Sequence, residues 1–291
     1  MHINRLLLGL FIIALLPSCA TQKLTEEGNT AYTEGDYTTA LAAWDQIIEK
    51  QESKGQKAEA KVYYKAGLAA YKLDQTNKAS NYLETAEYLE YSTPKLYASL
   101  ASIYQTIDNL SKEIEALEGY HKKYPEGDHI DTINVRLFET YVESENWDKA
   151  LNLWPEIKDQ AKQNVKLRAG YLTVNKNLEN EKLANKLARQ IIKLDPDNIT
   201  ALEYNAKRYF WKAENLYVSH MKAYKNNRTT SQYRKLLKAW KKVWPDFRKS
   251  RDYFRKLYQL SPKPEYAKFL GNIYKRMDKK QKADYWYNKA E

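Results

Sequence analysis

The sequence has a single cysteine and only four histidines. It therefore lacks the residues that most metal sites and most nucleophilic active sites require. One cysteine cannot form an intramolecular disulfide. Glycine and proline are also scarce, at 9 and 8 of 291 residues, which argues against an all-β chain with many tight turns. The composition therefore favours helices, and a hydrophobic content of 43% provides enough apolar material for a core.

The common nucleotide-binding, zinc-protease and hydrolase motifs are absent from the sequence. The nearest grouping of chemistry-bearing residues is Asp128, His129 and Asp131. We interpret it as the start of a helix whose first turn is capped by an aspartate. We therefore expect a protein that is not an enzyme and that needs no metal and no cofactor.

The N-terminus has the features of a signal sequence. Arg5 precedes an apolar run of 11 residues at 6–16, which is too short to cross a membrane but suits the core of a signal peptide. The segment 15–19, Leu-Leu-Pro-Ser-Cys, resembles a bacterial lipobox. That resemblance implies that residues 1–18 are removed and that Cys19 is acylated and anchors the chain in a lipid bilayer. The alternative is an ordinary signal peptide followed by an unrelated cysteine.

The residues after Cys19 bear on the membrane to which the anchor belongs. They are Ala20, Thr21 and Gln22. In proteobacterial lipoprotein sorting, which this region resembles, an aspartate here would retain the protein in the inner membrane. We therefore expect an anchor in the bacterial outer membrane, facing the periplasm.

A pattern of small and aromatic residues begins near the N-terminus, with Gly28, Gly35-Asp36, Ala40 and Trp44. In a helical hairpin, small residues such as Gly28 and Ala40 let the two helices pack closely, and Gly35-Asp36 forms the turn. The pattern recurs at intervals of 32 to 39 residues. The residues aligned with Gly28 are Gly67, Ala101, Phe138, Leu172, Ala206, Lys238 and Gly271. Those aligned with Ala40 are Ala79, Glu113, Ala150, Ala184, Val218, Ser250 and Ala283.

This pattern resembles the tetratricopeptide repeat, a helical hairpin of about 34 residues. The resemblance implies an all-α fold, a right-handed α-solenoid whose stacked hairpins bury a continuous core. It divides the chain into units 1–5 at 19–198, divergent basic and aromatic-rich units 6 and 7 at 199–262, and unit 8 at 263–291. It also implies a non-catalytic scaffold for protein–protein interactions. The tetratricopeptide lipoproteins of bacterial envelopes, including those of Bacteroidetes, are similar and serve outer-membrane assembly or secretion.

The divergent segment has neither glycine nor proline at its expected turn near Ala213. Since helix-forming residues flank this point, the sequence predicts a continuous helix over 200–225 and a break at 226–228. Two further helices are predicted, over 231–243 and over 245–260. Pro245 suits the first turn of the last helix, where its missing N–H does no harm.

Basic residues are concentrated in the last third of the chain. Residues 199–291 contain 24 Lys and Arg and 8 Asp and Glu, whereas the whole chain has a net charge of only +11. One interpretation is a solvated basic face; another is a docking surface for an acidic protein or for anionic envelope material, such as lipid or polymer. Nucleic acid is not an expected partner, because the signal sequence exports the protein.

The tetratricopeptide resemblance also suggests which residues line the concave groove. In that family, residues on the inner face of the first helix of each hairpin contact the bound partner. The corresponding residues in the basic region are Lys235, Lys242, Lys268, Asn272, Lys275 and Arg276. We expect these residues to bind an acidic protein partner or an envelope complex. The alternative is that the basic third binds a polyanion or a cell-envelope polymer.

Overall fold

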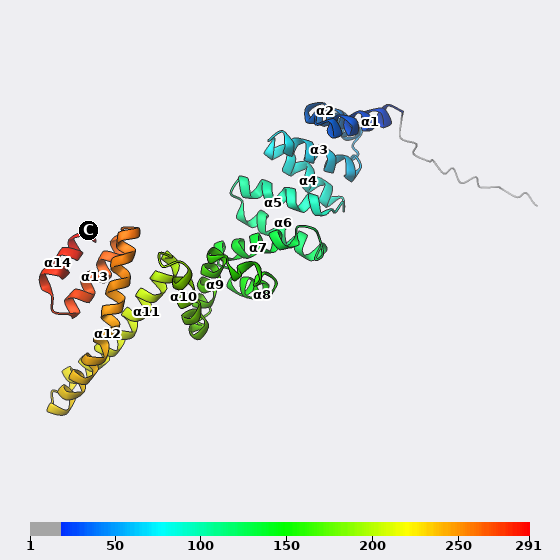
Figure 1. Cartoon of the computed structure of the whole chain (residues 1–291). Helices are drawn as coiled ribbons and strands as arrows, with labels where there is room; N and C mark the ends of the chain where they lie inside the picture. Colours follow the sequence, from blue (N-terminus) through cyan, green and yellow to red (C-terminus); the bar gives the residue numbers. More distant parts are fainter. Residues whose placement is uncertain (1–18) are drawn as a thin grey trace, which may run out of the picture. The chain divides into compact units, whose positions relative to one another are not determined.

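The structure is a computed structural model that describes residues 19–291. The expected signal peptide at 1–18 and the side chain of Cys19 lie outside the described residues. In the described range the chain is helical and contains no β-strand. No helix in this range combines the length and the apolar character that a membrane crossing requires. The helices, which are labelled in Figure 1, form two compact units. These units divide between Ile133 and Asn134.

The first unit consists of helical hairpins in chain order. Helix α1 pairs with α2, α3 with α4, and α5 with α6, and each hairpin also contacts the next one. The helices are α1 (Cys19–Glu34), α2 (Tyr37–Glu52), α3 (Ala60–Lys72), α4 (Thr76–Tyr88), α5 (Pro94–Thr106) and α6 (Leu110–Lys123). The stacking of hairpins expected from the sequence is therefore present.

The second unit repeats this arrangement and contains the longest helices. Helix α7 (Ile130–Glu143) crosses the division between the units, and its second part packs on α8 through Phe138 and Trp154. The pairs α9–α10, α11–α12 and α13–α14 follow. Their bounds, with that of α8 and a short 3-10 helix, are α8 (Trp147–Ile157), η1 (Gln160–Lys162), α9 (Val165–Asn177), α10 (Glu181–Leu194), α11 (Ile199–Asn226), α12 (Thr230–Leu260), α13 (Pro264–Arg276) and α14 (Lys280–Asn288).

A glycine in the first helix allows close packing of three hairpins. A Cβ atom on Gly67 would lie 2.7 Å from Leu83 Cγ, and one on Gly271 would lie 2.6 Å from the Tyr287 ring. Gly28 has the same relation to Trp44. In each case the contacted side chain belongs to the second helix, 16 residues later in the chain. The predicted role of the small residue is confirmed at these positions.

The turn within each short hairpin relies on one residue with a positive φ. Seven residues after the aligned small position, the backbone turns left-handed at Gly35, Asp74, Asp108, Glu145, Glu179 and Asp278. A left-handed residue ends the first helix, because it cannot continue the right-handed geometry. Hairpin α11–α12 has no such residue at the equivalent position, where Ala213 is helical and fully buried. Helix α11 therefore continues as one helix to Asn226, as predicted.

The predicted break before Pro245 is wrong, because α12 runs from Thr230 to Leu260 with Pro245 inside it. Its buried face passes through the proline without interruption, from Leu236 to Phe247. Because α11 is also long, packing along this whole face stabilises one helix despite the backbone hydrogen bond that proline cannot donate.

The repeat alignment of this segment is wrong at Val218 and Lys238, which are both exposed. The residue of the second helix that actually lies opposite Ala206 is Ser250. It is buried, and its hydroxyl donates a hydrogen bond to the Ala206 carbonyl at 2.8 Å. Residues 199–262 thus form one elongated hairpin instead of two ordinary ones. Val218 and Lys238 lie on exposed faces because the additional turns of α11 and α12 belong to this one hairpin and do not form a repeat of their own.

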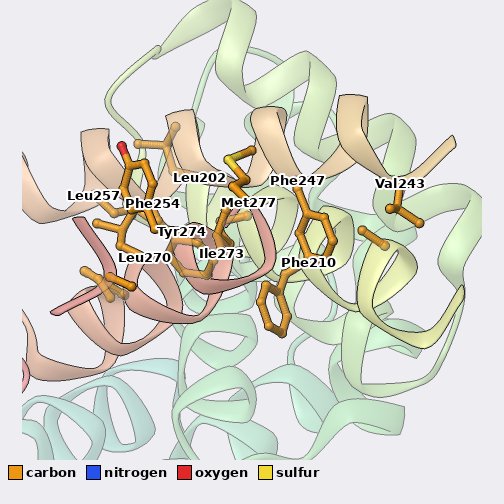
Figure 2. Close-up of a cluster of buried hydrophobic side chains, with 14 residues drawn as sticks. Leu202, Phe210, Val243, Phe247, Phe254, Leu257, Leu270, Ile273, Tyr274 and Met277 are labelled. Atoms are coloured by element: carbon orange, nitrogen blue, oxygen red, sulfur yellow. The ribbon is translucent and has the colours of Figure 1, made fainter. Parts of the chain in front are cut away.

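The base of the elongated hairpin packs against α13 through a cluster of buried aromatic and aliphatic residues (Figure 2). Phe254 stacks on Phe269 with ring centroids 4.5 Å apart, and Phe210 meets the same ring edge-on at 4.9 Å. Leu270 and Ile273 of α13 are completely buried in this cluster. The cluster fixes the first helices α11 and α13 beside each other.

We expect Gly67→Ala to destabilise the protein. Alanine would gain about 1 kcal/mol of helix propensity, but its methyl group would collide with Leu83, and overpacking costs about 1–3 kcal/mol. Urea unfolding measures the difference. The same change in a Leu83→Ala background should be better tolerated. Equal effects in both backgrounds would contradict the packing argument.

We expect Pro245→Ala to stabilise the protein by about 1–3 kcal/mol, because alanine restores a helical hydrogen bond and removes a ring clash. Thermal unfolding measures the change. Pro262→Ala is the control: this proline follows α12 in a loop, where its loss should lower stability slightly. A decrease in stability for Pro245→Ala would mean that the chain needs the proline there.

Candidate binding groove of the second unit

Two cavities follow one another along the first helices of successive hairpins, α9, α11 and α13. Their volumes are about 770 and 410 Å³. Trp211 of α11 lines both cavities. The first cavity is lined by Leu172, Thr173, Lys176, Glu179, Glu181, Ala184, Ile199, Thr200, Glu203, Tyr204, Lys207, Arg208, Trp211 and Lys263. The second is lined by Phe210, Trp211, Glu214, Glu265, Lys268, Phe269, Asn272, Lys275 and Arg276. We call the two together the A-helix groove.

Trp211 is the central apolar residue of the A-helix groove. It is 51% exposed, although tryptophan is usually well covered in folded proteins. Its ring meets Phe210 edge-on at 5.0 Å and Phe269 at 6.3 Å between centroids. Both rings belong to or pack on the hydrophobic cluster between the elongated hairpin and α13, so they hold the indole in place. The groove thus presents a fixed aromatic surface to solvent.

Two ion pairs cross the groove between α11 and α13. Lys207 Nζ lies 2.8 Å from a Glu265 carboxylate oxygen. Arg276 donates from Nε to Glu214 at 2.8 Å, and its guanidinium lies over the Tyr217 ring at 4.7 Å. The Glu214 carboxylate raises the pKa of Arg276 above its usual value. Arg276 therefore joins the two helices, and its charge is already matched within the protein.

The remaining cations of the second cavity have no matched charge. Lys268 and Lys275 are exposed and form no ion pair with another described residue. Both carboxylates of this cavity, Glu214 and Glu265, are occupied by the cross-groove pairs. The second cavity thus combines an aromatic wall with two available ammonium groups, a combination that suits an acidic segment with a bulky apolar side chain.

The structure brings four of the six predicted site residues together. Lys268, Asn272, Lys275 and Arg276 all line the second cavity. Asn272 accepts a hydrogen bond from the Tyr287 hydroxyl at 2.9 Å, so its carbonyl oxygen already has a partner.

Lys235 and Lys242, the other two predicted residues, are exposed on α12 and do not line the groove. The prediction that they line the groove requires residues 231–243 to be a first helix, whereas these residues belong to α12, the second helix of the hairpin.

Sequence reasoning missed Trp211, although a signal for it was present. Trp211 lies five residues after Ala206, just as Arg276 lies five residues after Gly271. The two are therefore equivalent positions of their hairpins, on the inner face of the first helix. Phe269 carried no such signal, because its half-buried position depends on contacts with Phe210 and Phe254 from other helices.

The first unit contains a separate cavity of about 710 Å³. Its lining includes Tyr71, Lys95, Tyr120, Asp128 and His129. The hydroxyl of Tyr120 is buried and has no hydrogen-bond partner. In the described part of the chain, no group of three or more His, Cys, Asp or Glu residues is arranged to hold a metal ion. The cavity lies between helices, and its lining combines polar side chains with apolar ones such as Pro94 and Ala98.

Comparison with known proteins agrees with this architecture. Residues 52–93 match the family model described as tetratricopeptide repeat. This segment, which contains the hairpin α3–α4, therefore carries one tetratricopeptide repeat. Among solved structures, one similar protein comes from Bacteroides ovatus and is proposed to be protein-binding; it is 20% identical, with a TM-score of 0.52, over 76% of this chain and 98% of its own. That likeness supports the tetratricopeptide fold. Among curated proteins none matches the sequence significantly.

A second similar structure is YrrB, described as a tetratricopeptide protein with an unusual peptide-binding site. It is 17% identical, with a TM-score of 0.46, over 64% of this chain and 97% of its own. We draw no conclusion about function from either likeness.

Proposed function

We propose that this tetratricopeptide protein is an interaction scaffold that binds an acidic segment of a partner protein in the A-helix groove. The observation that carries the proposal is the position of exposed Trp211 beside the unpaired ammonium groups of Lys268 and Lys275. An exposed indole fixed by neighbouring rings is a strong anchor for a partner side chain. The two lysines select for carboxylates and against basic segments.

The geometry of the groove also supports an elongated partner segment. The two cavities share Trp211 and follow three successive first helices. A groove of this kind contacts several residues of a bound chain in turn, whereas a small metabolite would need a more enclosed site. The ion pairs Arg276–Glu214 and Lys207–Glu265 hold the walls at a fixed spacing, which lowers the entropic cost of binding.

The proposal includes a location at a bacterial membrane. The lipobox-like segment ending at Cys19 supports lipid attachment, and the absence of aspartate at Ala20 supports the outer membrane. Anchored there and facing the periplasm, the scaffold would serve an envelope complex, in assembly or secretion. This part of the proposal rests on the sequence alone.

We expect Trp211→Ala to weaken partner binding by roughly 10- to 100-fold, the usual effect of losing an aromatic anchor. Peptides selected from a random display library by the purified chain serve as ligands, and fluorescence anisotropy measures their Kd. Lys268→Glu with Lys275→Glu should weaken binding and reduce its salt dependence. Lys182→Glu with Lys186→Glu on α10 is the charge-matched control. Selected peptides without acidic residues, or unchanged Kd values, would refute the groove assignment.

We expect Cys19→Ala to abolish lipid attachment. Bacterial cells expressing the chain would be labelled with radioactive palmitate, and the purified protein would be examined for the label. The wild-type chain should carry the label and fractionate with membranes, since each CH₂ of an acyl chain that is buried in the bilayer stabilises membrane binding by about 0.8 kcal/mol. An unlabelled wild-type protein would refute the anchor and leave the groove proposal intact.

A further inference from the structure

The elongated hairpin α11–α12 carries a dense and unbalanced positive charge beyond its base. Residues 215–245, which we call the hairpin extension, contain eight Lys and Arg and no Asp or Glu. All eight are exposed, and none forms an ion pair with another described residue. They are Lys222, Lys225, Arg228, Arg234, Lys235, Lys238, Lys241 and Lys242. Just below the extension, Asp246 is neutralised by Lys212 at 2.8 Å.

The hairpin extension is held together by its own side chains. Tyr217 meets Trp240 with ring centroids 6.0 Å apart, and Tyr224 meets Tyr233 at 5.6 Å. Leu236 is buried in the same seam. Figure 1 shows the yellow ends of the two helices lying side by side. Since this seam already joins the helices, the cations are not needed for folding, and their mutual repulsion opposes it.

Three apolar side chains of the hairpin extension remain exposed. Val218, Tyr233 and Leu237 are 45%, 47% and 39% exposed. Val218 and Leu237 each directly follow a seam residue, so in an antiparallel pair of helices both project to the same side. Tyr233 lies one turn before Leu237 and shares that side. Lys225 and Lys241 directly follow the seam residues Tyr224 and Trp240, and Lys222 lies one turn after Val218, so these three lysines share that side. One side of the extension is therefore both apolar and basic.

We propose that this side of the hairpin extension docks on an anionic phospholipid bilayer. Lysine and arginine would lie among the phosphate headgroups, and the exposed valine, leucine and tyrosine would enter the interface between headgroups and acyl chains. A hydrated acidic polymer would satisfy the cations but would gain little from Val218 and Leu237. The bilayer accounts for both kinds of side chain on one surface. This inference does not depend on the A-helix groove or on Cys19.

The test measures sedimentation of the full chain with vesicles. Phosphatidylcholine vesicles containing phosphatidylglycerol are compared with pure phosphatidylcholine vesicles. We expect strong, salt-sensitive binding only to the anionic vesicles, because each Lys or Arg near such a surface contributes about fivefold. Any contribution from residues 1–18 is the same for all variants, so differences between variants report on the extension.

Two sets of variants separate the lipid from other anions. Lys222→Glu, Lys225→Glu and Lys241→Glu together should reduce partitioning on the order of 100-fold, whereas Lys54→Glu, Lys182→Glu and Lys186→Glu should have little effect. Val218→Gln with Leu237→Gln should reduce it by roughly tenfold without changing charge. Circular dichroism checks folding, and glutamine replaces glutamate at the three lysines if the reversal unfolds the hairpin.

Two results would overturn the proposal. One is binding that does not depend on phosphatidylglycerol. The other is equal binding to soluble polyphosphate with no effect of Val218→Gln and Leu237→Gln, which would assign the surface to an acidic polymer.

Discussion

The protein depends on the close approach of two helices within each hairpin. Five of the seven described hairpins have glycine or alanine at the crossing point in the first helix. At Gly67 and Gly271 even a methyl group would collide with the second helix. Phe138 and Leu172 occupy this place in the other two, where α7–α8 and α9–α10 pack around larger side chains. Because one hairpin cannot cover its own apolar face, the stacked arrangement follows from this contact.

The turn that ends the first helix determines how long the hairpin is. Six hairpins place a left-handed residue there, and α11 places buried Ala213 instead. Helix α11 therefore continues beyond the repeat, and α12 must be equally long to return. The base of this hairpin keeps the repeat register, as the bond from Ser250 to Ala206 shows. A single altered turn thus adds an extension without disturbing the groove formed by α9, α11 and α13.

The basic excess is distributed unequally between these two surfaces. In the A-helix groove half of the charged residues form ion pairs, and Arg276 and Lys207 contribute to the walls through theirs. Lys268 and Lys275 remain without an ion pair among the described residues, in the cavity that Trp211 also lines. In the hairpin extension no charged side chain forms an ion pair, so all eight positive charges face solvent. The first surface suits a specific polypeptide, and the second suits an extended anionic surface.

The sequence by itself determined three things: the scarcity of glycine and proline favoured helices, the recurring small residues indicated hairpins, and the lack of glycine and proline near Ala213 indicated that no turn forms there. The resemblance to the repeat also placed Lys268 and Lys275 on the inner face of a first helix, and both line the second cavity, because regular repeats preserve the inward face of each first helix. Only the tertiary structure decided that α12 continues through Pro245 and that Lys235 and Lys242 lie outside the groove. The reason is physical: a helix can tolerate a proline when a long partner packs along its apolar face, and that partner is supplied by residues far away in the chain.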